Sequence, residues 1–232
     1  MTFRPGARPT GRPLHFVFLL DGSGSMAAQG KIEALNEAIR AALPDLRDVA
    51  AQNPFADLLV RAIVFADGAR WHVPQPTPIA ELTWAPVVAG GFTDLGAALT
   101  AVSEVLQVPP MDHRALPPVL VLISDGQPTD DFEAGLAALL AEPWGRRAVR
   151  MAIAIGADAD VDVLDRFIAD PGIKPFTAAG PEQLAYLVRF VSTAASRIAS
   201  QPGRPDAAEP VSEPRLPEPE LPEPADPQLL VW

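Results

Sequence analysis

The sequence contains no cysteine, and only three of its 232 residues are histidines. Without cysteine the chain can form no disulfide framework, no thiolate metal site and no cysteine nucleophile. A bound metal ion would therefore have to be held by oxygen ligands or by these few histidines. The redox compartment is left open, because a chain without cysteine can fold in an oxidising or a reducing one.

Long hydrophobic runs and a surplus of positive charge are also missing. No apolar run approaches the ~20 residues that a membrane-spanning helix requires. The apolar run at residues 14–20 follows three arginines, as in a secretion signal, but it is short and no small-residue cleavage site follows it. The formal net charge is −11, which disfavours a nucleic-acid binder. We therefore expect a cytoplasmic protein that binds neither membranes nor nucleic acid.

Proline is unevenly distributed and divides the chain. Hydrophobic residues make up 48% of the sequence, which is enough for a sizeable core. Residues 201–232 hold 9 of the 27 prolines and carry seven acids against two arginines. We predict an N-terminal extension over residues 1–12, one domain over residues 13–200, and a disordered tail over residues 201–232. Repeated Glu-Pro and Leu-Pro pairs favour an extended, polyproline-II-like backbone in this tail.

The last four residues of the tail are apolar. They are Leu229, Leu230, Val231 and Trp232. Two interpretations stay open for them: an unstructured chain end, or a second docking motif for a partner protein, held out on a stiff arm.

Continuous apolar runs alternate with segments of helical period along the first 200 residues. The runs cover residues 16–20, 58–65, 119–123 and 151–155. Runs without polar alternation suit strands that are covered on both faces, as in a parallel sheet. Between them, apolar residues recur at helical spacing, as at Ile32, Leu35 and Ile39. The pattern predicts an α/β fold with a Rossmann-like, doubly wound, mostly parallel sheet flanked by helices.

Two proline-containing segments refine this prediction. Pro74, Pro76 and Pro78 restrict residues 71–78 to an edge strand or a loop, because proline cannot donate to a sheet ladder. Pro181 follows a glycine and marks the start of a last helix that should end near Ser200.

Three polar loops lie where such a sheet presents its ligands, outside the carboxyl ends of the strands. They cover residues 21–26, 90–94 and 124–130. Their side chains are hydroxyls and carboxylates separated by glycines, a donor set that suits Mg²⁺, Mn²⁺ or Ca²⁺ and would not select zinc. Alternate residues of an extended loop share a side, so Asp21, Ser23 and Ser25 should face one concavity.

Taken together, these loops resemble the metal-ion-dependent adhesion site (MIDAS) of von Willebrand factor A (VWA) domains. The matching residues are Asp21, Ser23 and Ser25 in an Asp-x-Ser-x-Ser pattern, Thr93 after two glycines, and Asp125 at the end of a later apolar run. The resemblance covers residues 12–200. It implies that Ser23, Ser25 and Thr93 contact a Mg²⁺ ion through hydroxyl oxygen, with Mn²⁺ or Ca²⁺ as alternatives. Asp21 and Asp125 would lie nearby, often contacting the ion through water.

The same resemblance implies a function. An open coordination position on the ion would accept a Glu or Asp carboxylate of another protein, so that the chain is an interaction module and not an enzyme. Residues 96–99 and 125–131 resemble in particular the bacterial TerY-like branch, named for tellurium resistance. TerY-like domains are similar to proteins found beside protein-phosphatase and kinase-like components. This implies a cytoplasmic scaffold or adaptor in a stress-response, phosphorylation-linked or defence assembly.

Two enzymatic alternatives are weighed against this interpretation. Residues 22–27 also fit the Gly-x-Gly-x-x-Ala pattern of dinucleotide-binding proteins, with Asp67 as the ribose-binding acid, although it lies ~45 residues beyond the loop instead of ~20. A phosphotransfer aspartate at Asp21 or Asp125 beside Mg²⁺ is chemically possible. The sequence offers no lysine beside either aspartate for such a reaction. Lys31 is interpreted as a surface residue of the first helix.

Other polar and aromatic residues have simpler interpretations. Each histidine is interpreted as structural or solvated. Asp130 with Glu133 matches a capping box and should start a helix. Phe92 and Trp84 either form a rim that contacts a partner or pack inside the domain, and the sequence does not decide between these.

Overall fold

The structure is a computed structural model that describes residues 11–156, 159–199, 219 and 221. Within these residues six strands form a single sheet in the order β3-β2-β1-β4-β5-β6. The strands are β1 (Arg12–Asp21), β2 (Ala56–Ala66), β3 (Gly68–Pro78), β4 (Val119–Ser124), β5 (Val149–Ile155) and β6 (Phe176–Ala178). All neighbouring strands are parallel except β2 and β3, which are antiparallel. The predicted mostly parallel α/β sheet is confirmed.

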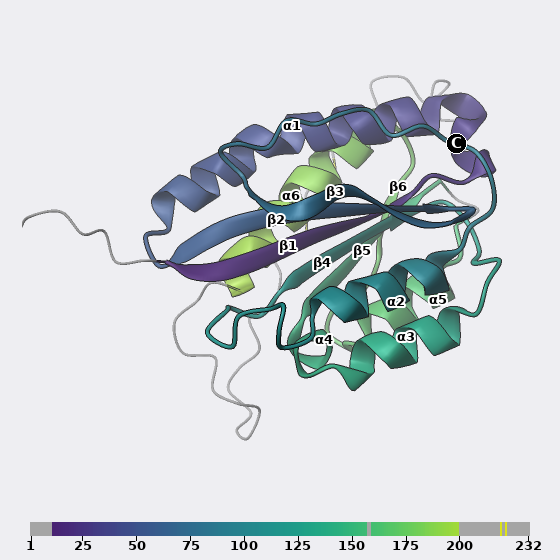
Figure 1. The fold of residues 1–232 in the computed structure, drawn as a ribbon. Coiled ribbons are helices and arrows are strands. Elements are labelled where there is room, and N and C mark those ends of the chain that lie inside the picture. The colour runs from purple at the N-terminus through teal and green to yellow at the C-terminus, as the bar shows by residue number, and fades with distance from the viewer. Residues whose placement is uncertain (1–10, 157–158, 200–218, 220, 222–232) are drawn as a thin grey trace, which may run out of the picture.

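Helices cover both faces of the sheet (Figure 1). They are the 3-10 segment η1 (Gly24–Gly30) and the helices α1 (Lys31–Gln52), α2 (Leu95–Val105), α3 (Phe132–Ala141), α4 (Pro143–Arg147), α5 (Val161–Ile168) and α6 (Pro181–Ala199). The helices α1 and α6 lie on one face, and α2, α3 and α5 lie on the other. No helix in the described part of the chain is long and apolar enough to cross a membrane.

The apolar runs become strands because both of their faces are buried. In β1, Phe16 and Phe18 pack into the cluster under α1 and α6, whereas Val17 and Leu19 pack into the cluster under α2, α3 and α5. Every residue of β4 and β5 is buried. The proline-rich strand β3 is the antiparallel edge of the sheet, as its missing amide donors predict.

The strand order reverses between β1 and β4. Strands β2 and β3 extend the sheet to one side of β1, and β4, β5 and β6 extend it to the other. In open α/β sheets ligands bind outside the carboxyl ends of the strands at such a reversal. Strand β1 ends at Asp21 and β4 ends at Ser124, so the first and third polar loops meet there.

The second polar loop is brought to the same place by the segment that follows β3. Residues 79–94 run along α1 in the opposite direction (Figure 1). Arg47 near the end of α1 donates to the carbonyl oxygens of Ile79 and Leu82, and Asn36 nearer its start bonds Val87. The chain then reaches Thr93 at the start of α2. Apart from Pro219 and Leu221, the predicted tail lies outside the described residues, including Leu229, Leu230, Val231 and Trp232.

Candidate metal centre

Asp21 is the innermost group of the candidate centre and has no solvent exposure. Its Oδ1 accepts a hydrogen bond from the Ser23 amide at 2.9 Å, and its Oδ2 accepts one from the Ser124 hydroxyl at 2.5 Å. Burial raises the pKa of the Asp21 carboxyl, although the hydrogen bonds from Ser124 and Ser23 act in the opposite direction. An ionised Asp21 therefore gains from a cation placed beside it.

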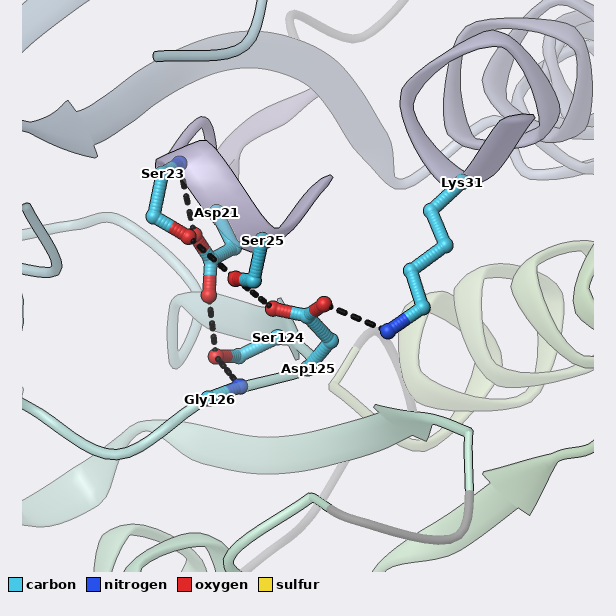
Figure 2. Close-up of polar contacts among 7 residues, drawn as sticks. All are labelled: Asp21, Ser23, Ser25, Lys31, Ser124, Asp125 and Gly126. Carbon is cyan, nitrogen blue, oxygen red and sulfur yellow. Dashed lines mark hydrogen bonds and ion pairs between the residues drawn. The ribbon is translucent and has the colours of Figure 1, made fainter. Parts of the chain in front are cut away.

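The two serines and Asp125 form a chain of hydrogen bonds (Figure 2). The Ser25 hydroxyl donates to Asp125 Oδ1 at 2.7 Å, and the two serine Oγ atoms are 2.9 Å apart. Because the Ser25 proton is committed to Asp125, its oxygen accepts from Ser23. Asp21, Ser23 and Ser25 were predicted to face the same side of their loop, and these contacts agree with that prediction.

Thr93 meets the other two loops around Gly126. A methyl group built on Gly126 would lie 3.8 Å from Thr93 Oγ1, 3.9 Å from Ser25 Oγ and 4.0 Å from Asp21 Oδ2. Oxygens from the first and second loops therefore lie close to Gly126 of the third loop, where glycine adds no side chain. Thr129 holds Thr93 in this place, since the Thr93 amide donates to Thr129 Oγ1 at 2.9 Å and the Thr129 amide donates to the Thr93 carbonyl oxygen at 3.0 Å.

These donors fit a hard divalent cation. Adjacent oxygens on an octahedral Mg²⁺ ion, with Mg–O bonds of about 2.0–2.1 Å, lie roughly 2.9 Å apart. The serine oxygens are 2.9 Å apart, a hydrogen-bond distance that would also allow them to occupy neighbouring positions on such an ion. Among residues with a described position, no group of three or more His, Cys, Asp or Glu side chains could hold a metal ion. The donor set at this centre consists instead of two carboxylates and several hydroxyls.

Lys31 contradicts the sequence interpretation. It is not a surface residue: its Nζ donates to Asp125 Oδ2 at 2.7 Å, and the two side chains are only 11% and 1% exposed. Gly30, directly before α1, has a φ of 73°, a backbone conformation that glycine adopts without strain. Figure 2 shows the Lys31 side chain extending from the start of α1 to Asp125. Both Asp125 oxygens therefore already accept hydrogen bonds.

The sequence did not predict the supporting roles of several residues. Ser124 orients Asp21, and Asp67 Oδ1 accepts from the Phe92 amide at 3.0 Å. Asp130 accepts from the Gly96 and Ala97 amides at the start of α2, so it caps α2 and not α3. The predicted capping box is therefore wrong, and Asp131 is the N-cap of α3. A local sequence pattern cannot show that a carboxylate caps a helix distant in sequence.

The two aromatic residues near the centre have different surroundings. Trp84 is buried, and its Nε1 donates to Asn36 Oδ1 at 3.0 Å, so it packs inside the domain. Phe92 is 67% exposed although it directly precedes Thr93. Only Phe92 is therefore available as a rim contact.

Comparisons with known proteins identify the family and agree with the fold. The family model for the von Willebrand factor type A domain matches residues 16–190. A von Willebrand factor type A structure from Catenulispora acidiphila aligns with a TM-score of 0.61 and 18% identity, covering 79% of this chain and 43% of that chain. The ArnB paralog VWA2 from Sulfolobus acidocaldarius aligns with a TM-score of 0.57 and 18% identity, covering 76% and 44%.

A third similar structure contains a bound metal ion. It is proximal thread matrix protein 1 from the mussel byssus "with zinc occupied MIDAS motif", with a TM-score of 0.57, 18% identity, and coverage of 79% of this chain and 45% of that chain. The present chain spans less than half the length of these three structures. No curated protein matches the sequence significantly.

Proposed function

Because the chain belongs to the von Willebrand factor type A domain family, we propose that it is a divalent-cation-dependent module that docks an acidic side chain of another protein. The observation that carries this proposal is the convergence of Thr93, Ser25 and Asp21 oxygens around Gly126, at the strand-order reversal where such folds bind ligands.

Each residue has a distinct part in this proposal. The hydroxyls of Ser23, Ser25 and Thr93 hold the ion, and neutral ligands leave most of its charge uncompensated. Asp21 and Asp125 orient these hydroxyls and balance part of the charge. The ion supplies a Lewis-acidic position for a Glu or Asp carboxylate. Phe92 gives the docked segment an exposed apolar contact beside that position.

We propose that Mg²⁺ occupies this centre in the cell, with Mn²⁺ and Ca²⁺ as alternatives. Oxygen donors favour these hard cations. Because the mussel protein has a zinc-occupied MIDAS motif, the affinity of this chain for Zn²⁺ should be measured beside its affinity for the other ions.

The domain boundaries and the cellular context are parts of the same proposal. We place one domain at residues 13–200, after an extension over residues 1–12 and before a tail over residues 201–232. The sequences of residues 96–99 and 125–131 support a TerY-like scaffold in a bacterial, cytoplasmic stress-response or defence assembly. Its partner would be a phosphatase or kinase-like component, with Leu229, Leu230, Val231 and Trp232 as a second docking motif.

A phosphotransfer enzyme is the strongest competitor, because Lys31 does lie beside Asp125. Two observations disfavour it. The side chain of Asp125 is almost fully buried, and Asp21 is completely so. All four oxygens of the two carboxylates accept hydrogen bonds, which leaves neither poised as a nucleophile. The dinucleotide alternative is also disfavoured, because Asp67 bonds the Phe92 amide of the second loop.

The test is Mn²⁺ binding to the chelator-treated full chain, measured by calorimetry. We expect Thr93→Ala and Gly126→Ala each to weaken binding about tenfold or more, since one removes a ligand and the other places a methyl group between the oxygens. Gly126→Ala should fold normally, because its new contacts of 3.8–4.0 Å are ordinary van der Waals distances.

Thr100→Ala is the matched control, since the Thr100 hydroxyl bonds only within α2, to the Gly96 carbonyl oxygen. Affinity capture with wild type and Thr93→Ala, with and without EDTA, then identifies the partner that depends on the ion. Unchanged Mn²⁺ affinity in both site variants would refute the proposed centre.

A further inference from the structure

Lys31 places a positive charge inside the proposed metal centre. The sequence has only one other lysine, Lys174. We infer that Lys31 is a resident counter-ion: it competes with the divalent cation for Asp125, and it leaves the loaded centre with a net positive charge that an acidic partner cancels. This inference rests on the proposed function and concerns how the same centre is regulated.

The contact itself is close and shielded from solvent. Lys31 Nζ lies 2.7 Å from Asp125 Oδ2, and the side chains are 11% and 1% exposed. A lysine side chain is long and usually keeps its ammonium in water, so burying it costs free energy unless a charged partner compensates. Buried ion pairs seldom add net stability compared with apolar residues of similar volume. Stability alone therefore does not explain the buried Lys31–Asp125 ion pair, and the functional role of Asp125 offers an explanation.

Asp125 is the group for which the ammonium and the metal ion compete. Its Oδ1 is bonded by Ser25, one of the proposed metal ligands, and its Oδ2 is bonded by Lys31. Asp21 has no such cation: its oxygens accept from the Ser23 amide and the Ser124 hydroxyl. The ammonium therefore compensates one of the two carboxylates before any ion binds.

A charge count shows the consequence. With both carboxylates ionised, Asp21, Asp125 and Lys31 together carry −1. A divalent ion brings the centre to +1, and the carboxylate of a partner then brings it to zero. Without Lys31 the loaded centre would be neutral and the docked complex would carry −1 in a buried place, where uncompensated charge is costly. Lys31 thus weakens ion binding and strengthens docking of an acid to the loaded centre.

The test is Lys31→Met in the full chain, with Mn²⁺ as the probe. Methionine keeps a long, unbranched apolar side chain and removes the charge. We expect the Mn²⁺ dissociation constant to fall about tenfold or more, because the ion no longer competes with an ammonium. Lys31→Arg, which keeps the charge, should stay near the wild-type value. Lys174→Met is the matched control, since Lys174 is 69% exposed and pairs with Asp165 on the surface.

Acetate serves as the probe for acid docking. Titrating acetate into the Mn²⁺-loaded protein displaces water from the ion, which lowers the water-proton relaxation enhancement. We expect Lys31→Met to bind acetate about tenfold more weakly than wild type. Equal acetate affinity would overturn the second half of the inference, and a Mn²⁺ dissociation constant that is unchanged or higher in Lys31→Met would overturn the first.

If Lys31→Met folds poorly, thermal unfolding with and without Mn²⁺ still tests the inference. Removing Lys31 leaves Asp125 buried without a cation, so Lys31→Met should melt at a lower temperature than wild type in chelator. Mn²⁺ should raise the melting temperature more in the variant than in wild type. A variant that stays unfolded at saturating Mn²⁺ would overturn the inference. If wild type itself binds no Mn²⁺, it is the proposed function that fails.

Discussion

At the scale of single residues, His15 is a titratable group remote from the metal centre. It lies in β1, six residues before Asp21, which is roughly 20 Å along the strand. The pKa of His15 is lowered to about 4, chiefly by burial and also by the nearby Arg61 guanidinium, while Asp112 acts in the opposite direction. The folded protein therefore holds this imidazole neutral at pH values where the unfolded chain protonates it.

This shift predicts an acid-sensitive fold. Because the pKa of His15 falls from 6.5 in the unfolded chain to about 4 in the fold, its contribution to stability is complete above pH 6.5 and is lost as the pH falls through about 4. Between pH 7 and pH 4, we expect wild type to lose about 2–3 kcal/mol more of its free energy of unfolding than His15→Gln loses. Urea unfolding of both proteins at the two pH values measures this. A pH-independent difference would contradict the assignment. His113→Gln is the control, since its side chain is mostly exposed.

The sequence predicts the residues of the centre better than the contacts that orient them. Asp21, Ser23 and Ser25 could be grouped because alternate residues of one loop share a side. Ser124 and Lys31 could not, because their roles depend on where the ends of β4 and α1 lie relative to β1. Lys31 also follows Gly30, whose left-handed backbone no hydrophobic period records.

At the scale of elements, one buried asparagine attaches residues 79–94 to α1. Asn36 Nδ2 donates to the carbonyl oxygens of Ile32 and Val87, and its Oδ1 accepts from Trp84 Nε1 and the Val87 amide. All of these groups are withdrawn from water, so they depend on Asn36 for their hydrogen bonds. The same segment contains Thr93 near its end, which links this attachment to the metal centre.

Replacing this asparagine should therefore affect both stability and metal binding. We expect Asn36→Leu to lower the free energy of unfolding by about 3 kcal/mol, because buried groups of Trp84 and Val87 lose their partners. Urea unfolding measures this loss, and Mn²⁺ affinity should also fall in the folded variant as Thr93 loses its support. Asn53→Leu, where the side chain accepts only from the Phe55 amide at the end of α1, should cost about 1 kcal/mol or less. Equal losses at the two positions would contradict this role for Asn36.

Strands and helices with a clear hydrophobic pattern were predicted. Segments whose conformation depends on tertiary contacts were not. The four apolar runs lie within β1, β2, β4 and β5, and the predicted last helix agrees with α6. Strand β6 was missed because it has only three residues, too few to show a period. Residues 79–94 have no regular structure to predict, and α1 determines their path through side-chain hydrogen bonds.

At the scale of the whole molecule, the strand order explains why distant loops form one centre. The chain winds outward from β1 on one side and outward from β4 on the other, so the loops after these central strands are neighbours although about a hundred residues separate them. An alternating strand and helix pattern predicts this class of sheet but does not give the order of its strands. The contacts of Asp67 and Thr129 with the second loop depend on this order and not on the pattern.

The described fold closes before the proline-rich tail begins. The helix α6 ends at Ala199, and the described residues of both hydrophobic clusters lie between Leu14 and Ala199. A chain cut after Ser200 should therefore keep its free energy of unfolding within about 0.5 kcal/mol, because the cut removes none of the described residues of either cluster. Urea unfolding of the cut and full chains measures this.

Metal binding and partner binding should respond differently to the same cut. The Mn²⁺ affinity should stay the same, because every residue of the centre precedes residue 130, whereas the affinity for the captured partner should fall if Leu229, Leu230, Val231 and Trp232 make a second contact. The cut also changes the formal net charge from −11 to −6, so full and cut chains should be compared at two salt concentrations to separate lost contacts from lost charge. Equal partner affinity at both would remove the tail from the docking surface and leave the metal centre as the proposed site.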